Sequence, residues 1–365
     1  MAINAKERDI IALSMVPGIG ASRLMRLVDK FDSLRPLFDM SLPEFKELFT
    51  RNGDITASPG DILRSGEIAS EISFMEAAGI KPVFSHDGEY PEALRNIDQP
   101  PIMLFSKGTM IVDDIRAVAI VGARMCTAYG LRMAEKLAYD LAKNGITVVS
   151  GLAKGIDQAS HRGALMAGGR TIAVMGSGFR NIYPDGAQKM VDMIASNGAV
   201  LTEYHSNMKP LAFNFPARNR IISGLSRGVV VVEAGERSGA LITVDYALEQ
   251  GRDVFAVPGC ADNRSSRGSN KLIQDGAKLV TSARDILEEM GIEAYEHVSL
   301  NESPGRTPEG ENEKRVIRAI GSGEIGFDLI SETTGIETGA LPGILIGLEL
   351  KNIVRALPGA RYALK

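Results

Sequence analysis

The chain has 365 residues, of which 44% are hydrophobic and 24% charged, a composition typical of a globular protein with two or three domains. Its formal net charge of −4 argues against indiscriminate coating of DNA, so any nucleic-acid binding has to come from a local cationic pocket. The two cysteines lack metal-ligand spacing, and no apolar signal segment or membrane-length run is present, so the sequence predicts a cytoplasmic protein without a metal or a membrane anchor.

Residues 1–80 are predicted to form a helical N-terminal domain. Apolar residues recur there at helical spacing, at Ile10, Leu13, Leu24, Leu27 and Val28. The VPGIG turn at 16–20 between them is typical of SAM-like or helix-hairpin-helix elements, whose turn amides can hold a backbone phosphate. A plain helical hairpin explains the same pattern. Because only Arg23 and Arg26 add positive charge, the sequence favours the plain hairpin.

Residues 81–290 are predicted to form a Rossmann-like, doubly wound domain. Strand candidates lie at 82–85 and 102–105, and then at 117–121, 146–149, 171–175, 199–201, 229–232 and 254–257, with helical patterns between most of the later ones. Such Val, Ile and Ala runs indicate a mostly parallel sheet that helices cover on both faces.

Two further segments follow. Residues 291–313 hold six glutamates and one arginine, which predicts an acidic flexible linker. Residues 314–365 are predicted to form a winged-helix-like domain of three helices, the third at 341–350, and a hairpin around Pro358 and Gly359. Because the third helix has no Lys or Arg before Lys351, we favour a protein contact over DNA reading there, with both interpretations left open.

The doubly wound domain lacks the motifs of common cofactors and of serine hydrolases. Its first turn is GARMC rather than GxGxxG, and after Gly176 and Gly178 the third glycine position holds Asn181. The chain lacks the Gly-Lys dipeptide of a P-loop, and its GxSxG match at 224–228 precedes a predicted strand instead of joining a strand to a helix, as a nucleophile elbow does. We therefore expect no cofactor and no catalytic residue.

Glycines and cations instead follow several of the predicted strands. Because the carboxyl ends of parallel strands meet at one edge of a sheet, we expect these residues to form a row of phosphate-binding sites. Several such sites in one row favour a polyanion as the ligand. The candidate DNA-binding residues are Gly122, Arg124, Gly151, Lys154, Gly155, Ser177, Gly178, Arg218, Asn219, Arg220, Ser238 and Gly239.

Aromatic residues near these turns could stack unpaired bases, namely Phe179, Tyr183, Phe213 and Phe215. A competing interpretation pairs Arg218 and Arg220 with Asp157 and Glu233 inside the domain, and we expect it to hold for one of the two arginines. His161 shares a helix face with Asp157, and we expect it to form a hydrogen bond rather than to catalyse.

Eight ordered stretches between Tyr90 and Ala277 resemble the DprA family (DNA-processing protein A, also called Smf). They include IVGARMCTAYG, VVSGLAKGIDQASHRGAL, FPARNRIISGLS and VVEAGERSGALIT. The resemblance implies a homodimer that binds single-stranded DNA and is not an enzyme. It also implies protection of incoming DNA during natural transformation, and loading of the RecA recombinase onto that strand past single-strand-binding protein.

The resemblance also assigns site residues. The family's G-S-R turn corresponds to Gly122, Ala123 and Arg124, where the alanine removes a hydroxyl donor and leaves the backbone seat intact. Lys154 occupies the variable, often basic position of SGLAxGID, and residues 218–220 match the RNR block.

Two alternatives from other classes remain open. VVEAGERSGALIT also resembles the acidic, Gly-rich turns of lysine-decarboxylase-like nucleotide phosphoribohydrolases, and Glu233 would then be the candidate acid. The other alternative is a protein-binding adaptor without affinity for single strands.

Overall fold

The structure is a computed structural model that describes residues 3–292, 310–321, 324–350, 353–357 and 360–364. It consists of two compact units, which divide between residues 294 and 295. Most of the predicted acidic linker lies outside the described residues. Among the helices that are described, none is both long and apolar enough to cross a membrane.

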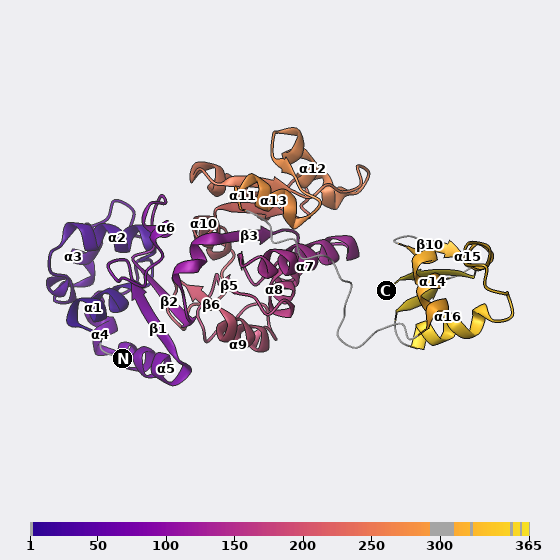
Figure 1. Ribbon diagram of the computed structural model, residues 1–365. Coiled ribbons are helices and arrows are strands. Elements are labelled where there is room, and N and C mark those ends of the chain that lie inside the picture. The colour runs from indigo at the N-terminus through magenta and orange to yellow at the C-terminus, as the bar shows by residue number, and fades with distance from the viewer. Residues whose placement is uncertain (1–2, 293–309, 322–323, 351–352, 358–359, 365) are drawn as a thin grey trace. The chain divides into compact units, whose positions relative to one another are not determined.

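The first unit begins with short helices, drawn in indigo and purple in Figure 1. They are α1 (Ala5–Ser14), α2 (Ala21–Lys30), η1 (Arg35–Phe38), α3 (Leu42–Glu47), α4 (Pro59–Arg64) and α5 (Glu67–Ala78). The helical prediction for this segment is therefore confirmed. These helices share one hydrophobic cluster with β1, β2 and the helix α9, so the predicted boundary at residue 80 falls within a common core.

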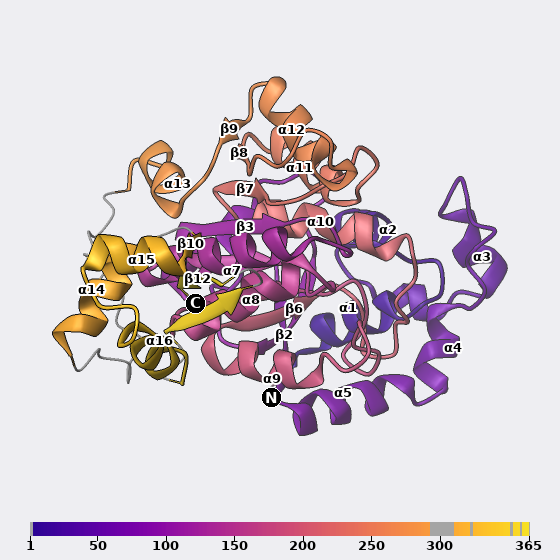
Figure 2. The same cartoon turned by 90° about the vertical axis from the view of Figure 1, so that its right-hand side faces the viewer.

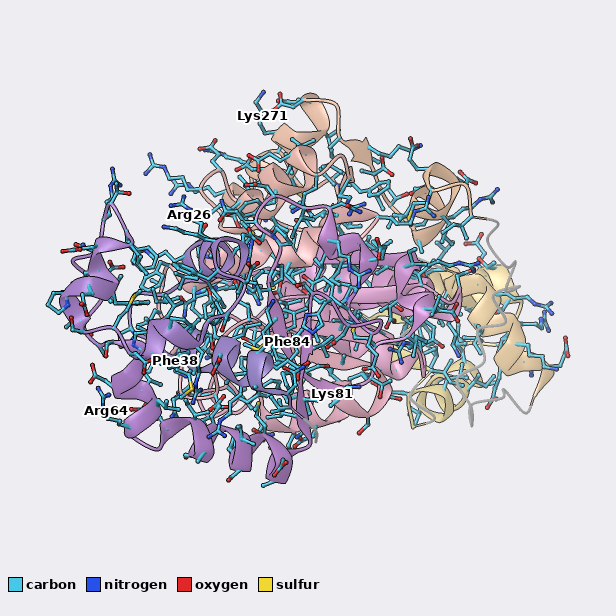
Figure 3. The ribbon with its side chains drawn as sticks, turned by 90° about the vertical axis from the view of Figure 1, so that its left-hand side faces the viewer. Arg26, Phe38, Arg64, Lys81, Phe84 and Lys271 are labelled. Atoms are coloured by element: carbon cyan, nitrogen blue, oxygen red, sulfur yellow. The ribbon has the colours of Figure 1, made fainter. Side chains whose placement is uncertain are left out.

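The turn between α1 and α2 packs against the protein itself. Gly18 has φ +89°, and a Cβ there would lie 2.7 Å from the carbonyl oxygen of Asp54. Arg23 donates hydrogen bonds to the carbonyl oxygen of Gly18 and to the Asp54 carboxylate, while Arg26 stands exposed on α2 (Figure 3). This arrangement is that of the plain helical hairpin which the sequence favoured.

In the described part of the chain, nine strands form one sheet in the order β1-β2-β6-β5-β4-β3-β7-β8-β9. Strands β3 to β9 pair in parallel, and β1 and β2 join antiparallel beside β6. The bounds are β1 Ile80–Phe84, β2 Met103–Gly108, β3 Ala117–Val121, β4 Thr147–Ser150, β5 Thr171–Val174, β6 Ala199–Thr202, β7 Gly228–Val231, β8 Asp253–Ala256 and β9 Lys278–Leu279. The mostly parallel, doubly wound prediction is confirmed, and β9, whose two residues are both exposed, was not predicted.

Alternate strand residues face opposite helical layers. Ala117, Ala119 and Val121 of β3 share a hydrophobic cluster with α10 and α11, whereas Val118 and Ile120 share one with α7, α8 and α13. Helix α9 lies along β2 and β6 (Figure 2). The helix bounds are α6 Glu92–Arg95, α7 Ala128–Lys143, α8 Ile156–Met166, α9 Gln188–Asn197, α10 Asn214–Gly224, α11 Ala240–Glu249, α12 Arg267–Gln274 and α13 Ala283–Glu289, with 3₁₀ turns η2 Val112–Arg116 and η3 Arg264–Ser266.

The second unit is a winged helix, as predicted. Its elements are α14 Glu311–Ile320, β10 Glu324–Gly326, α15 Phe327–Thr334, α16 Leu341–Leu350, β11 Val354–Leu357 and β12 Arg361–Leu364. The predicted linker runs three residues into α14, which already begins at Glu311, and β10 was not predicted. β11 and β12 form the expected hairpin, whose turn at Pro358 and Gly359 lies outside the described residues, as does Lys351. On α16, Ile346 is 57% exposed, and a single exposed apolar side chain does not decide between a protein contact and DNA reading.

Candidate nucleic-acid interface

A cavity of about 610 Å³ opens at the carboxyl ends of β3 and β7. These two neighbouring strands mark the point where the chain order reverses across the sheet, the usual ligand position in an open α/β sheet. The cavity is lined by Val121, Gly122, Ala123, Arg124, Met125, Ala153, Asp157, Ala212, Phe215, Pro216, Arg218, Asn219, Ile222, Gly235, Arg237, Ser238, Gly239, Ala240, Thr243, Arg264 and Ser265. Four arginines face one aspartate, so the lining has a formal charge of +3 in a chain whose net charge is −4.

Arg218 forms the buried side of the cavity and is only 4% exposed. Its guanidinium donates hydrogen bonds to the carbonyl oxygen of Gly151, at 2.8 Å, and to that of Val174, so it ties together the ends of β4 and β5. Burial lowers the pKa of Arg218 to about 10, partly offset by the nearby Asp157, so the group stays cationic at neutral pH. Burial also raises the pKa of Asp157 to about 6, an effect that Arg218 opposes.

Arg124 lies on the exposed side of the cavity. Its guanidinium lies 5.2 Å from the ring centroid of Phe215, within cation–π range. Phe215 in turn packs edge-on against Tyr183, with centroids 5.4 Å apart. No acid pairs with Arg124 among the described residues, so its charge is available to an anionic ligand.

The structure brings half of the predicted contacts together. The cavity lining contains Gly122, Arg124, Arg218, Asn219, Ser238 and Gly239. Asn219 links the two sides, because it accepts from Arg218 Nε at 3.2 Å and its amide lies 3.4 Å from the carbonyl oxygen of Gly239. The other predicted contacts, Gly151, Lys154, Gly155, Ser177, Gly178 and Arg220, do not line the cavity.

Other parts of the protein occupy the phosphate-binding site that was predicted at the start of α8. A Cβ at Gly151 would lie 2.6 Å from the Arg218 guanidinium, and one at Gly155 would lie 2.4 Å from the carbonyl oxygen of Ala123. The Ile156 amide donates to that same carbonyl oxygen. Both glycines therefore permit close packing of the cavity loops rather than approach of a ligand. Lys154 is exposed beside this turn.

Protein atoms also occupy the phosphate-binding site that was predicted at residues 176–178. Ser177 is 1% exposed, and a Cβ at Gly178 would lie 2.1 Å from the carbonyl oxygen of His205. Phe179 is 7% exposed and belongs to the hydrophobic core, so its predicted role in base stacking was wrong. Phe213, in contrast, is 70% exposed just before α10.

Arg220 is an internal residue, as the competing interpretation expected for one arginine. Its guanidinium forms two hydrogen bonds with the Glu203 carboxylate, at 2.8 and 2.7 Å, rather than with Glu233, and both side chains are 7% exposed. We therefore withdraw Arg220 as a DNA contact. Helix α10 begins at Asn214, four residues before Arg218.

Glu233 and His161 also have structural partners. The Glu233 carboxylate accepts from the amide and the hydroxyl of Thr127 at the start of α7, the latter at 2.8 Å, and it does not line the cavity. His161 is fully buried, with Nδ1 2.7 Å from Thr171 Oγ1, so the predicted hydrogen-bonding role is confirmed.

Two cavity arginines were not predicted. Arg237 and Arg264 are exposed and stand in the loops that follow β7 and β8. Arg237 could have been found, because it directly precedes the chosen Ser238. Arg264 carries no such signal, since its loop has no glycine-rich motif to fix its position.

One surface cluster could hold a cation. Glu7, His86 and Asp87 each place a ligand atom within 4.8 Å of the others, and His86 Nε2 lies 3.5 Å from Glu7 Oε1 and 3.7 Å from Asp87 Oδ1. The His86 side chain is 56% exposed, and the same contacts suit ion pairs with a protonated imidazole, so this cluster assigns no metal.

Comparison with known proteins identifies relatives over nearly the whole chain. The profile of the family described as "DNA recombination-mediator protein A" matches residues 81–291, and that of "DprA winged helix domain" matches 302–360. Protein Smf of Synechocystis is 32% identical over 98% of this chain and 99% of its own length. DNA processing protein DprA of Streptococcus pneumoniae is 49% identical over 56% of this chain and 72% of its own.

Two solved structures resemble this one. The X-ray structure of DNA processing protein A from Streptococcus pneumoniae superposes with a TM-score of 0.64, at 37% identity, over 81% of this chain and all of the other. A structure of DNA processing protein A from Helicobacter pylori, whose subject is its single-stranded DNA binding mode, gives 0.52 at 29% identity, over 58% of this chain and 95% of the other.

Proposed function

The chain belongs to the DprA/Smf family of DNA-processing proteins, and on this basis we propose that it binds single-stranded DNA in the cavity at the carboxyl edge of its sheet. A relative whose structure is described by its single-stranded DNA binding mode supports the choice of ligand. We further propose that it acts in the cytoplasm as a recombination mediator without a catalytic step, protects incoming strands, and loads RecA past single-strand-binding protein as a homodimer.

The observation that carries the proposal is the charge and shape of the cavity. Arg124, Arg218, Arg237 and Arg264 come from four different segments and meet at the switch point of the sheet, in a protein that is acidic overall. Such a local concentration of cations attracts a phosphodiester backbone to the cavity without causing non-specific DNA binding over the whole surface.

The same cavity offers a base-stacking surface. The Arg124 guanidinium and the Phe215 ring provide a cation and an aromatic face within 5.2 Å of each other. Stacking on such a face requires an unpaired base, and each stacked base contributes about 1–3 kcal/mol whatever its identity. Charge and stacking together thus favour a single strand over a duplex, with little dependence on sequence.

Fluorescence anisotropy with labelled oligo-dT and a matched duplex tests this proposal. We expect tighter binding of the single strand, with a log–log salt slope of about −0.7 for each phosphate neutralised. Arg124→Ala should weaken binding about tenfold, which corresponds to one charge-assisted contact of about 1.4 kcal/mol.

Arg116→Ala is the matched control. Arg116 is an exposed arginine that directly precedes β3, at the opposite edge of the sheet, so its removal changes the net charge equally but leaves the cavity intact. Equal losses in the two variants would mean that binding follows net charge rather than this cavity. If the wild-type chain binds neither DNA, the proposal fails.

The mediator role needs a separate assay. RecA loading is measured as strand exchange on DNA that is first coated with single-strand-binding protein, with and without the chain. The proposed homodimer is tested by sedimentation velocity over a range of protein concentrations. A monomer at all concentrations, or no acceleration of strand exchange, would contradict these two finer proposals while leaving DNA binding untouched.

A further inference from the structure

The loop between β6 and α10, residues 203–213, connects the N-terminal helices to the cavity. It leaves the end of β6 and runs directly into α10 at Asn214. Ala212, near its end, lines the cavity, and so do Phe215 and Pro216 in the first turn of α10. The position of this β6–α10 loop therefore determines where one side of the cavity stands.

Glu71 of helix α5 holds the middle of the β6–α10 loop. Its carboxylate Oε1 accepts from the backbone amide of Ser206 at 2.7 Å and from the Ser206 hydroxyl at 2.8 Å. Both residues are buried, with 1% and 2% of their surfaces exposed. Buried hydrogen bonds to a carboxylate are strong, and losing the acceptor leaves two donors without partners.

A second segment holds the other side of the same loop. The amide of Arg180 donates to the carbonyl oxygen of Ser206 at 3.0 Å, and the amide of Gly178 donates to that of Met208 at 2.9 Å. The Arg180 guanidinium lies 3.9 Å from the ring centroid of Phe74, which stands three residues after Glu71 on α5. Helix α5 thus contacts the loop directly and also through Arg180.

We propose that Glu71 is a positioning residue for DNA binding, which fixes the β6–α10 loop so that the cavity is preformed. This inference rests on the proposed single-stranded DNA function. It assigns the N-terminal helices a part in the binding site, although none of their residues line the cavity. If loss of the Glu71 hydrogen bonds leaves only a tenth of the molecules with the loop in its binding-competent position, the apparent Kd for DNA rises about tenfold.

Three variants separate this role from a loss of stability. Glu71→Leu keeps the size of the side chain but removes the acceptor. Glu71→Gln retains an oxygen that can accept both Ser206 donors, so it should restore binding. Asp114→Leu is the matched control, because Asp114 is also a buried carboxylate, bound to Arg170 and Thr147, at the amino edge of the sheet away from the cavity.

Anisotropy with labelled oligo-dT is measured well below the unfolding midpoint of each variant. We expect the Kd to rise about tenfold or more in Glu71→Leu and to equal that of wild type, within the error of the assay, in Glu71→Gln and Asp114→Leu. The log–log salt slope should be unchanged in Glu71→Leu, because the loop alters the competent population and not the number of phosphates contacted. Ser206→Ala, which removes only the hydroxyl donor, serves if Glu71→Leu does not fold, with an expected loss of about threefold.

Loop position is read directly by a single tryptophan. The chain contains none, so Leu211→Trp, in the exposed part of the β6–α10 loop, supplies the only indole. Without DNA, the indole anisotropy should fall when Glu71→Leu is added and should not change with Asp114→Leu. An unchanged Kd or indole anisotropy in Glu71→Leu, with wild type binding normally, overturns this inference alone. Failure of the wild type to bind overturns the proposed function.

Discussion

Burial of His161 in its neutral form should make its own contribution to stability fall as the pH falls, in the opposite direction to that of Asp157, whose raised pKa favours the folded chain at lower pH. The side chain is fully buried, and Nδ1 lies 2.7 Å from Thr171 Oγ1. The Thr171 hydroxyl donates its only hydrogen to the carbonyl oxygen of Val148, also at 2.7 Å, so it can only accept from His161. The proton of the neutral imidazole therefore sits on Nδ1, and Nε2 is a buried atom without a partner among the described residues.

Protonation of Nε2 would place an unpaired charge in the core. Burial, with a contribution from the Arg218 charge, lowers the pKa of His161 from 6.5 to about 3. Because the folded pKa lies below the unfolded one, the unfolded chain binds the extra proton, and stability is lost as the pH falls from 6.5 towards 3. The loss approaches about 1.4 kcal/mol per pH unit below pH 6 and comes to about 2 kcal/mol between pH 6.5 and 4.5, because the unfolded histidine is only half protonated at pH 6.5.

Urea unfolding of wild type and His161→Asn at several pH values measures this loss. The asparagine amide can replace Nδ1–H as a donor but does not titrate, so the variant should lose about 2 kcal/mol less than wild type between pH 6.5 and 4.5. Thr171→Val is the control, since it removes the hydrogen bond but keeps the buried imidazole and should therefore keep the wild-type pH dependence. Parallel curves for wild type and His161→Asn would refute the reasoning.

Three other substitutions test the assignments around the cavity. Gly155→Ala should destabilise the fold by about 2 kcal/mol or more, because the φ of +84° and the contact with the loop after β3 exclude a side chain at this position. The same change should weaken DNA binding. Urea unfolding measures the first effect and fluorescence anisotropy the second. Arg220→Leu should cost about 3–5 kcal/mol by leaving the Glu203 carboxylate buried and unpaired, and adding Glu203→Leu should recover most of that loss in urea melts. Lys154→Ala should weaken oligo-dT binding less than Arg124→Ala does, because Lys154 lies outside the cavity lining, and it should change the salt slope by no more than about 0.7. An effect as large as that of Arg124→Ala would indicate that the DNA binds nearer to α8.

The sequence predicted the sheet well because strand burial leaves a simple pattern. Every residue of β3, for example, is buried between two helical layers, so all five are apolar and the strand is found with its exact bounds. The short edge strand β9 has no such pattern, since Lys278 and Leu279 are both exposed. Parallel order also predicted correctly that the loops after β3 and β7 meet at one edge.

The phosphate-binding sites were predicted less well, because a glycine can leave room either for a ligand or for another part of the protein. These two uses look alike in sequence. At Gly239, which lines the cavity, a Cβ would meet nothing within 4 Å, so the missing side chain leaves room for a ligand. At Gly155 and Gly178, the missing Cβ admits a carbonyl oxygen of the protein itself, at 2.4 and 2.1 Å from the Cβ position. Only the packing of distant loops distinguishes the two uses, and no local pattern reports it.

The arginine block could have been interpreted more sharply from helix geometry alone. Successive residues of an α-helix are turned by about 100°, so Arg218 and Arg220 point about 200° apart and cannot both face one cavity. In α10 the first faces the carboxyl ends of β4 and β5, and the second faces Glu203, while Asn219 between them reaches towards Gly239. The short helical motif therefore directs one charge towards the cavity and the other into the fold, and each substitution in it tests one of these positions.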